Sequence, residues 1–283
     1  MSEGTVVLFE DAMRQRQLDR PRIMTEADLE LRREAPVSAK TCHAAFTDVA
    51  FDYMVKKRQV PVFDNLSVSF PRDRRIAVLG HKGSGKSSIL DMLSGTAPPR
   101  RGRVAIYSRI SWKLTKLSYF DGRMSTRQNI LYLARLMDIN APHLIHYVRD
   151  LCDMSEKRLN EPMGAQKIDV RRRIGIIIAI AANFDCYLID DRFKPEKFNL
   201  VGPAAPMGDF LLQRDYIITL SDTRFIPQTC DLAYILYESR IFKFDDVAKA
   251  IDVFKSLPIP EGESPSGAAE DDDEEDEAQE ELL

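Results

Sequence analysis

Hydrophobic and polar positions follow two patterns along this 283-residue chain, one typical of strands and one typical of helices. Short apolar or alternating runs bounded by turn residues predict strands over 46–53, 62–70, 76–79, 104–107, 186–189, 216–220 and 232–237. Apolar residues at helical spacing predict helices over 88–93, 125–137, 142–151, 170–182 and 247–257. The mixture of strands and helices predicts an α/β fold.

Two local patterns refine this prediction. The strands over 46–53 and 62–70 are joined by polar residues and suit an antiparallel flap beside a parallel core. Ser125 and Gln128 stand three residues apart at the start of an apolar helical pattern, which predicts a capping box. The long stretch between the strands over 104–107 and 186–189 is therefore expected to be helical.

A glycine-rich stretch separates the predicted strand over 76–79 from the predicted helix over 88–93. It has the pattern G-x-x-x-x-G-K-[ST] and consists of Gly80, His81, Lys82, Gly83, Ser84, Gly85, Lys86, Ser87 and Ser88. The glycines let backbone N–H groups converge on phosphate oxygens at the positive end of a helix. Lys86 can add a charge for the β- and γ-phosphates, and the Ser87 hydroxyl can ligate Mg²⁺. We expect nucleotide to bind here; the alternative is a glycine-rich turn without a ligand.

Two more candidate site residues lie outside the loop. The apolar run 186–189 ends in Asp190, about a hundred residues after the loop, as in a Walker B strand. Asp190 is therefore expected to face the Mg²⁺ held by Ser87. Tyr53 ends the first predicted strand and could stack on a nucleotide base, although an ordinary edge-strand aromatic is the alternative.

Charge is distributed unevenly along the chain. The net charge is −4, but residues 261–283 hold 12 of the 44 acidic residues and no Lys or Arg, which leaves 40 basic against 32 acidic residues in the body, about +8. Such a body tolerates a nucleotide, lipid headgroups or the cytoplasmic loops of a membrane protein. Arg100, Arg101 and Arg103 lack interleaved aromatic residues, so we expect a solvated surface there and no nucleic-acid partner.

The four cysteines form no C-x-x-C pair and indicate a reducing compartment. The first residues lack the apolar region of a signal peptide, and the longest apolar run, 174–182, has nine residues. We therefore expect a cytoplasmic protein that contacts the membrane only through a partner.

The composition suggests three regions. Residues 1–44 are predicted to be a partly disordered amino-terminal extension, either a solvated tail or a docking arm. Residues 45–257 are expected to form the nucleotide-binding domain, with a helical insertion over about 112–182. Residues 258–283 are predicted to be an acidic, disordered tail.

The order of flap, phosphate loop, helical insertion and Walker B strand resembles the ATPase subunit of an ABC transporter. Several stretches are similar, more narrowly, to the subfamily that exports capsular or O-antigen polysaccharide; they are 110–112, 120–122, 125–130, 183–190 and 242–247 with 250–251. The resemblance covers about residues 46–256. It implies a P-loop NTPase of ABC ATPase type, with a mixed sheet core, an antiparallel β flap and a helical insertion. It also implies ATP sandwiched between two such domains and Tyr53 at the adenine-stacking position.

The resemblance breaks at the hydrolytic positions. The signature loop falls at 166–170, Gln-Lys-Ile-Asp-Val, without serine or glycine, and Asp169 would place a negative charge near a phosphate. The glutamine that senses Mg²⁺ is replaced by Asp121, and the glutamate after Walker B by the shorter Asp191. The switch histidine falls at Asp222 or Ser221.

These departures favour an ATP-binding subunit with Mg²⁺ whose hydrolysis is weak or depends on a partner, with Asp191 as a weak catalytic candidate. By the resemblance, such a subunit forms a homodimer, or a heterodimer with a more complete ATPase, and couples ATP to a separate membrane permease on the inner face of the cell membrane. The alternative is a nucleotide-gated regulatory or scaffold protein without transport activity.

Overall fold

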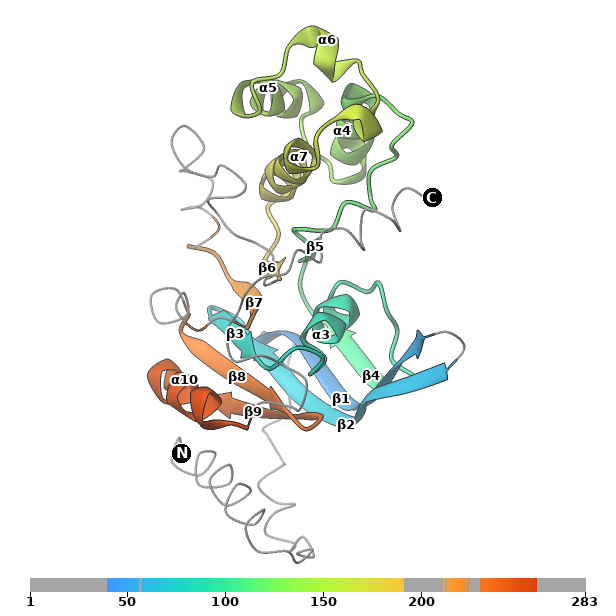
Figure 1. Cartoon of the computed structure of the whole chain (residues 1–283). Coiled ribbons are helices and arrows are strands. Elements are labelled where there is room, and N and C mark those ends of the chain that lie inside the picture. The colour runs from blue at the N-terminus through green and yellow to red at the C-terminus, as the bar shows by residue number, and fades with distance from the viewer. Residues whose placement is uncertain are drawn as a thin grey trace, which may run out of the picture. The chain divides into compact units, whose positions relative to one another are not determined.

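The computed structural model describes residues 40–55, 58–190, 211, 213–221, 223 and 230–258 (Figure 1). The described chain divides into two compact units, which are treated separately. The first contains the described residues within 40–113, 184–190 and 211–257, and the second contains residues 114–183 and residue 258. Most of the predicted amino-terminal extension and all but the first residue of the predicted acidic tail lie outside the described residues.

A six-stranded sheet forms the centre of the first unit, in the order β5-β6-β7-β3-β8-β9. Its strands are β3 (Arg75–Leu79), β5 (Ile110–Lys113), β6 (Cys186–Ile189), β7 (Tyr216–Leu220), β8 (Leu232–Tyr237) and β9 (Arg240–Phe244). The neighbours from β5 to β8 are parallel, whereas β9 returns antiparallel to β8. β6 and β7 are buried along their whole length, as expected for strands covered on both faces, so their sequences are continuous apolar runs.

A second, antiparallel sheet in the same unit has the order β2-β1-β4. It is built from β1 (Cys42–Val55), β2 (Arg58–Pro71) and β4 (Arg101–Ile106), so the predicted mixed core with an antiparallel flap is confirmed. The ring of Phe70 lies 5.6 Å from that of Phe46 and 5.7 Å from that of Tyr234, by centroids. Phe70 thus packs β2 against both β1 and the core strand β8.

The first unit also holds helices α3 (Lys86–Leu93) and α10 (Val247–Ser256). α3 follows β3 after the loop over 80–85, and its buried Ile89, Leu90 and Leu93 belong to the hydrophobic core. The Asp246 side chain caps α10 by accepting from the Lys249 N–H at 3.1 Å. Both helices therefore lie close to the predicted ends, within one or two residues.

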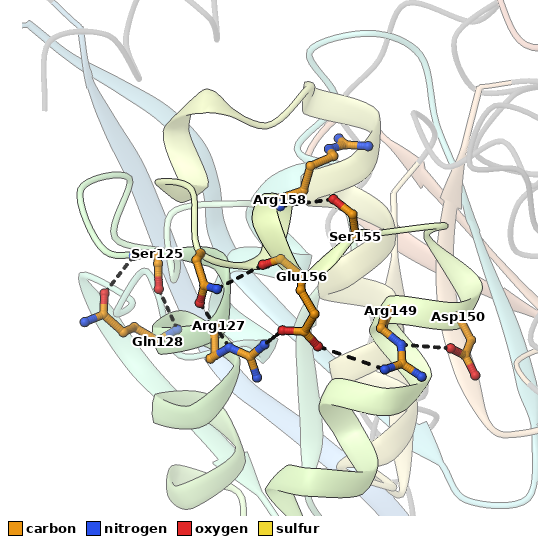
Figure 2. A network of polar contacts seen from close by, with 9 residues as sticks. Ser125, Arg127, Gln128, Arg149, Asp150, Ser155, Glu156 and Arg158 are labelled. Carbon is orange, nitrogen blue, oxygen red and sulfur yellow. Dashed lines mark hydrogen bonds and ion pairs between the residues drawn. The ribbon is translucent and has the colours of Figure 1, made fainter.

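The second unit consists of α4 (Thr126–Leu136), α5 (Ala141–Leu151), α6 (Glu156–Leu159) and α7 (Ile168–Ala181), with a 3₁₀ turn over Met163–Ala165. The predicted capping box is confirmed, because Ser125 Oγ accepts from Gln128 N at 3.1 Å while Ser125 N donates to Gln128 Oε1 at 2.8 Å. Figure 2 shows this box at the start of α4.

Polar contacts tie three helices of the second unit together (Figure 2). Glu156 of α6 accepts from Arg127 of α4, and its other oxygen lies 4.0 Å from Arg149 of α5. Ser155 caps α6, and Asn140 caps α5 by accepting from the His143 N–H at 3.0 Å.

None of the helices in the described part of the chain has the length and apolar character needed to cross a membrane.

Some predicted boundaries were wrong, and each error has a physical cause. The strand predicted over 104–107 begins at Arg101, because Arg101 and Arg103 pair with Ala50 and Thr47 of β1 while their side chains face solvent. The helix predicted from residue 170 begins at Ile168, and β5, β9, α6 and the 3₁₀ turn were not predicted. These elements are short, and their apolar residues are too few to give a period.

Candidate functional site

The phosphate loop connects the central strand β3 to α3. The Lys86 side chain folds back over the loop, where its Nζ donates to the carbonyls of Gly80 at 2.7 Å and His81 at 3.0 Å. The residue is only 7 % exposed. A buried ammonium group held by loop carbonyls at the start of a helix forms a concentrated positive charge.

Gly85 is required at the junction between the loop and the helix. It adopts φ 97°, and a Cβ at this position would lie 2.5 Å from the side chains of Phe63 and Val62 on β2. As the N-cap of α3, Gly85 offers no side chain, and the first turn of α3 contains no acidic residue. No side-chain cap therefore competes with an anionic ligand at the start of this helix.

The other loop residues divide into exposed and packed positions. Lys82, Gly83 and Ser87 are exposed, whereas Gly80 and Ser88 are buried. The His81 ring stacks on Phe254 of α10 at 5.0 Å, so this predicted ligand residue contributes its backbone to the loop and its ring to packing. Ser84 N donates to His81 O at 3.2 Å and closes the turn.

Asp190 lies at the same edge of the sheet as the loop. Ile189 of β6 is paired with Ile218 of β7, and Leu79 of β3 is paired with Leu220 of the same strand. Because the three strands are parallel, Asp190 and the loop both follow the carboxyl ends of their strands. Asp190 is 4 % exposed, which makes it a buried carboxylate at the edge where ligands of such sheets bind.

Tyr53 of β1 lies beside the first turns of α3. Its hydroxyl accepts from Ser88 Oγ at 3.0 Å and donates to Asp91 Oδ2 at 3.4 Å. The rings of Phe51 and Tyr53 pack in a T-shaped arrangement, with centroids 5.0 Å apart at an interplanar angle of 88°. Burial raises the pKa of Tyr53, yet the residue remains 39 % exposed and presents part of its ring to solvent.

The sequence prediction missed Asp91 and Lys113, which complete this cluster. Lys113 Nζ lies 2.8 Å from Asp91 Oδ1. Neither residue belongs to a recognisable motif, and Lys113 ends the unpredicted strand β5. The spacing of Asp91 three residues after Ser88 on a helix was the one available signal.

The residues at the predicted hydrolytic positions are divided between the two units and the part of the chain outside the described residues. Asp191 and Asp222 lie outside the described residues, and Ser221 is exposed directly after β7. Asp121 lies in the second unit, where its carboxylate accepts from Arg123 N at 2.9 Å. Its own N–H donates to Asn129 Oδ1 at 2.9 Å, and Asn129 is 2 % exposed. The Asp121 turn is thus fixed by internal bonds.

The stretch predicted to replace the signature loop leads into α7. Gln166 is 4 % exposed and bonds twice to Arg158, accepting from Nη2 at 2.9 Å and donating to the carbonyl at 3.1 Å. Lys167 is the N-cap of α7 and forms no side-chain cap bond, and Asp169 stands in the first turn. An anion at this helix start would therefore meet a carboxylate.

Residues 63–193 match the family model described as ABC transporter. The capsule polysaccharide export ATP-binding protein CtrD of Neisseria meningitidis serogroup B is 25 % identical over 214 residues, which cover 73 % of this chain and 95 % of that protein. The polysialic acid transport ATP-binding protein KpsT of Escherichia coli is 27 % identical over 200 residues, which cover 69 % of this chain and 90 % of that protein.

Solved structures show the same fold at low sequence identity. A dimeric, post-hydrolysis structure of the ATP-binding cassette MJ0796, bound to ADP and Pi, superposes with a TM-score of 0.53 at 13 % identity, covering 70 % of this chain and 96 % of that chain. An inward-facing metal-chelate type ABC transporter superposes with a TM-score of 0.54 at 17 % identity, covering 77 % of this chain and 90 % of that chain. These likenesses concern the fold.

Proposed function

We propose that this chain, which carries an ABC transporter domain and is homologous to polysaccharide export ATP-binding proteins, is the ATP-binding subunit of an exporter of capsular polysaccharide or a related glycan. The observation that carries the proposal is the phosphate loop, in which the buried Lys86 ammonium lies at the start of a helix without a side-chain cap. The N–H groups of that helix and Lys86 suit the phosphates of ATP.

The residues at the sheet edge also suit Mg²⁺. This ion usually keeps several waters and takes one or two protein oxygens together with the nucleotide phosphates. The exposed Ser87 hydroxyl and the buried Asp190 carboxylate provide such oxygens at one edge of the sheet. In this proposal Ser87 and Asp190 would hold Mg²⁺, which would offset the negative charge of the phosphates.

The subunit would work as a dimer beside a membrane permease on the cytoplasmic face. Tyr132 and Leu136 of α4 support a protein contact, since they lie four residues apart on one helix face and are 56 % and 61 % exposed. We propose this α4 face for the permease. The membrane would then be reached through the permease alone.

Hydrolysis is proposed to be weak or assisted by a partner subunit. Gln166 and Asp121 are engaged in internal bonds, and Asp169 places a carboxylate at the start of α7. Asp191 is proposed to polarise the attacking water, as a shorter replacement for a glutamate. A more complete ATPase could supply a favourable signature loop to this chain's phosphate loop.

The proposal is tested by titrating the full chain with ATP-Mg²⁺ in a calorimeter and assaying phosphate release. Lys86→Ala should weaken ATP binding about 10- to 100-fold, because a charge-assisted contact to phosphate is lost. Lys243→Ala removes an exposed lysine elsewhere in the first unit and serves as the matched control. Failure of the unmodified chain to bind ATP-Mg²⁺ would refute the proposal.

The alternative function is a nucleotide-gated regulatory protein. The internal bonds of Gln166 and Asp121 favour it, because they hold two hydrolytic positions in structural roles. Asp191→Asn separates the two functions in cells. Glycan export should fall in this variant if the chain is a transport ATPase, whereas partner binding should persist unchanged if ATP acts only as a gating ligand.

A further inference from the structure

Hydrogen bonds to residues of α3 hold the hydroxyl end of the Tyr53 side chain. The buried Ser88 hydroxyl donates to the Tyr53 oxygen at 3.0 Å, and this oxygen lies 3.4 Å from Asp91 Oδ2. Because the Asp91 carboxylate can only accept, the phenol proton points to Asp91 and its lone pair receives the Ser88 proton. The orientation of both hydroxyl groups is therefore set by Asp91.

Asp91 is itself held firmly. Its Oδ1 lies 2.8 Å from Lys113 Nζ and accepts from Thr96 Oγ1 at 3.1 Å. The side chains of Asp91 and Lys113 are only 16 % and 11 % exposed, so this ion pair is screened less by solvent than a surface pair. A carboxylate in such a position keeps its place on α3.

The contact with Phe51 completes the support of the ring. Phe51 is 5 % exposed and meets the Tyr53 ring at 88°, while the hydroxyl end is held by α3. In the described part of the chain, the side-chain hydrogen bonds of Tyr53 are those to Ser88 and Asp91. The ring is thus held by its contact with Phe51 and by the hydrogen bonds of its hydroxyl group.

We infer that Asp91, with Lys113 as its charge partner, is a positioning residue for the nucleotide base. By holding the Tyr53 phenol, it fixes the ring beside the phosphate loop before ATP arrives, and a fixed ring loses less conformational freedom on stacking. The inference rests on the proposed function, since it assigns the base-stacking role to Tyr53. It adds that the affinity for the base depends on a carboxylate on α3 that has no contact with the nucleotide itself.

The test compares ATP-Mg²⁺ with tripolyphosphate-Mg²⁺ by calorimetry on the full chain. Tripolyphosphate occupies the phosphate loop but has no base, so it reports on the loop alone. Tyr53→Phe and Asp91→Asn should each weaken ATP binding about three- to tenfold, the usual range for one lost hydrogen bond, and leave tripolyphosphate binding unchanged. The double variant should be no weaker than Tyr53→Phe, because Asp91 acts on the ring through the phenol that this change removes.

Asp231→Asn is the matched control. It breaks the bidentate pair between Arg75 and Asp231 at the other end of β3, with distances of 2.6 and 2.8 Å, and should change neither affinity. The inference is overturned if Asp91→Asn binds ATP like the unmodified chain, or if it weakens ATP and tripolyphosphate by the same factor. Absence of ATP binding in the unmodified chain would instead overturn the proposed function.

Discussion

Helices α3 and α7 both begin without a side-chain cap, whereas α4, α5 and α10 begin on Ser125, Asn140 and Asp246, whose side chains accept a backbone N–H. The first turn of α3 has no acidic residue, whereas that of α7 contains Asp169. α3 therefore keeps the partial positive charge of its first turn for an external anion, while α7 neutralises much of its own. The two starts also differ in backbone, since the N-cap of α3, Gly85, has φ 97° whereas the N-cap of α7, Lys167, has φ −57°.

The residues before each helix sharpen the contrast. The loop before α3 places the Lys86 ammonium against its own carbonyls, at the site where phosphate is expected. The segment before α7 instead uses Gln166 to hold Arg158 inside the second unit. The two helix starts therefore differ in charge, the first with a lysine ammonium and the second with a carboxylate.

The largest expected effect comes from breaking the start of α3. Gly85→Ala forces an L-residue into φ 97° and brings its Cβ to 2.5 Å from Phe63, so unfolding free energy should fall by about 2–4 kcal/mol. Gly95→Ala is the control, because φ is 72° there but nothing lies within 4 Å of the added Cβ. Urea denaturation measures both, and equal losses would contradict the assigned clash with β2.

The next effect concerns the packing of α7. A Cβ at Gly175 would collide with the hydroxyl of Tyr119, so Gly175→Ala should cost about 1–3 kcal/mol of stability by overpacking. Tyr119→Phe in the same chain should recover part of this loss, because the oxygen is removed. Thermal unfolding of the single and double variants measures the recovery; strictly additive losses would show that the two residues do not meet.

A smaller effect is expected from neutralising the start of α7. Asp169→Ser should cost about 0.3–1 kcal/mol, because a favourable charge at a helix start is lost. ATP-dependent phosphate release should nevertheless rise if this carboxylate repels a phosphate. Asp252→Ser, on an exposed position of α10, is the control, and unchanged turnover in Asp169→Ser would remove the functional part of the comparison.

The smallest effect is a pH dependence in the first unit. Hydrogen bonds from the Arg75 guanidinium hold the pKa of Asp231 below its usual range. A lowered folded-state pKa stabilises the fold above the usual aspartate pKa of about 3.9, and this contribution is lost as pH falls below it. Both side chains are about one-third exposed, so the loss should be no more than about 1 kcal/mol. In the unmodified chain the urea midpoint should therefore fall as pH is lowered from about 5 to about 3. Asp231→Asn should remove the part of this fall that comes from Asp231.

The short strands β7 and β8 and the capped helix α4 were predicted well, whereas the 14-residue strands β1 and β2 extend beyond the predicted ranges 46–53 and 62–70. β7 and β8 match their predicted bounds, and α4 lies within the predicted range, since apolar runs and a capping box are local signals. The bounds of β4 and β5 depended on pairing with distant strands. Ile110 of β5 is paired with Cys186 of β6, and no pattern in the sequence near Ile110 predicts this partner.

The turn between β8 and β9 shows a different limit. Glu238 and Ser239 adopt φ 48° and 60° in a two-residue hairpin loop, a conformation usually signalled by Asn-Gly or Gly-Gly. Neither residue carries that signal, so β9 was missed.

For the candidate site, the phosphate loop was predictable as a sequence motif. The support of Tyr53 by Asp91 and Lys113 was not, because it depends on how β1, α3 and β5 meet.

The order of strands has a consequence for how the chain acquires its fold during synthesis. β3, which leads into the phosphate loop, is paired with β7 and β8, and these strands begin only at Tyr216 and Leu232. The antiparallel sheet ends at Ile106 and can pair much earlier, and α4, α5, α6 and α7 of the second unit contact one another and all end by Ala181. A nascent chain therefore carries the complete loop sequence long before the strand beneath it is flanked. A ribosome-bound chain truncated before residue 216 should fold the antiparallel sheet and the helices of the second unit, while the phosphate loop still lacks the strands that flank β3.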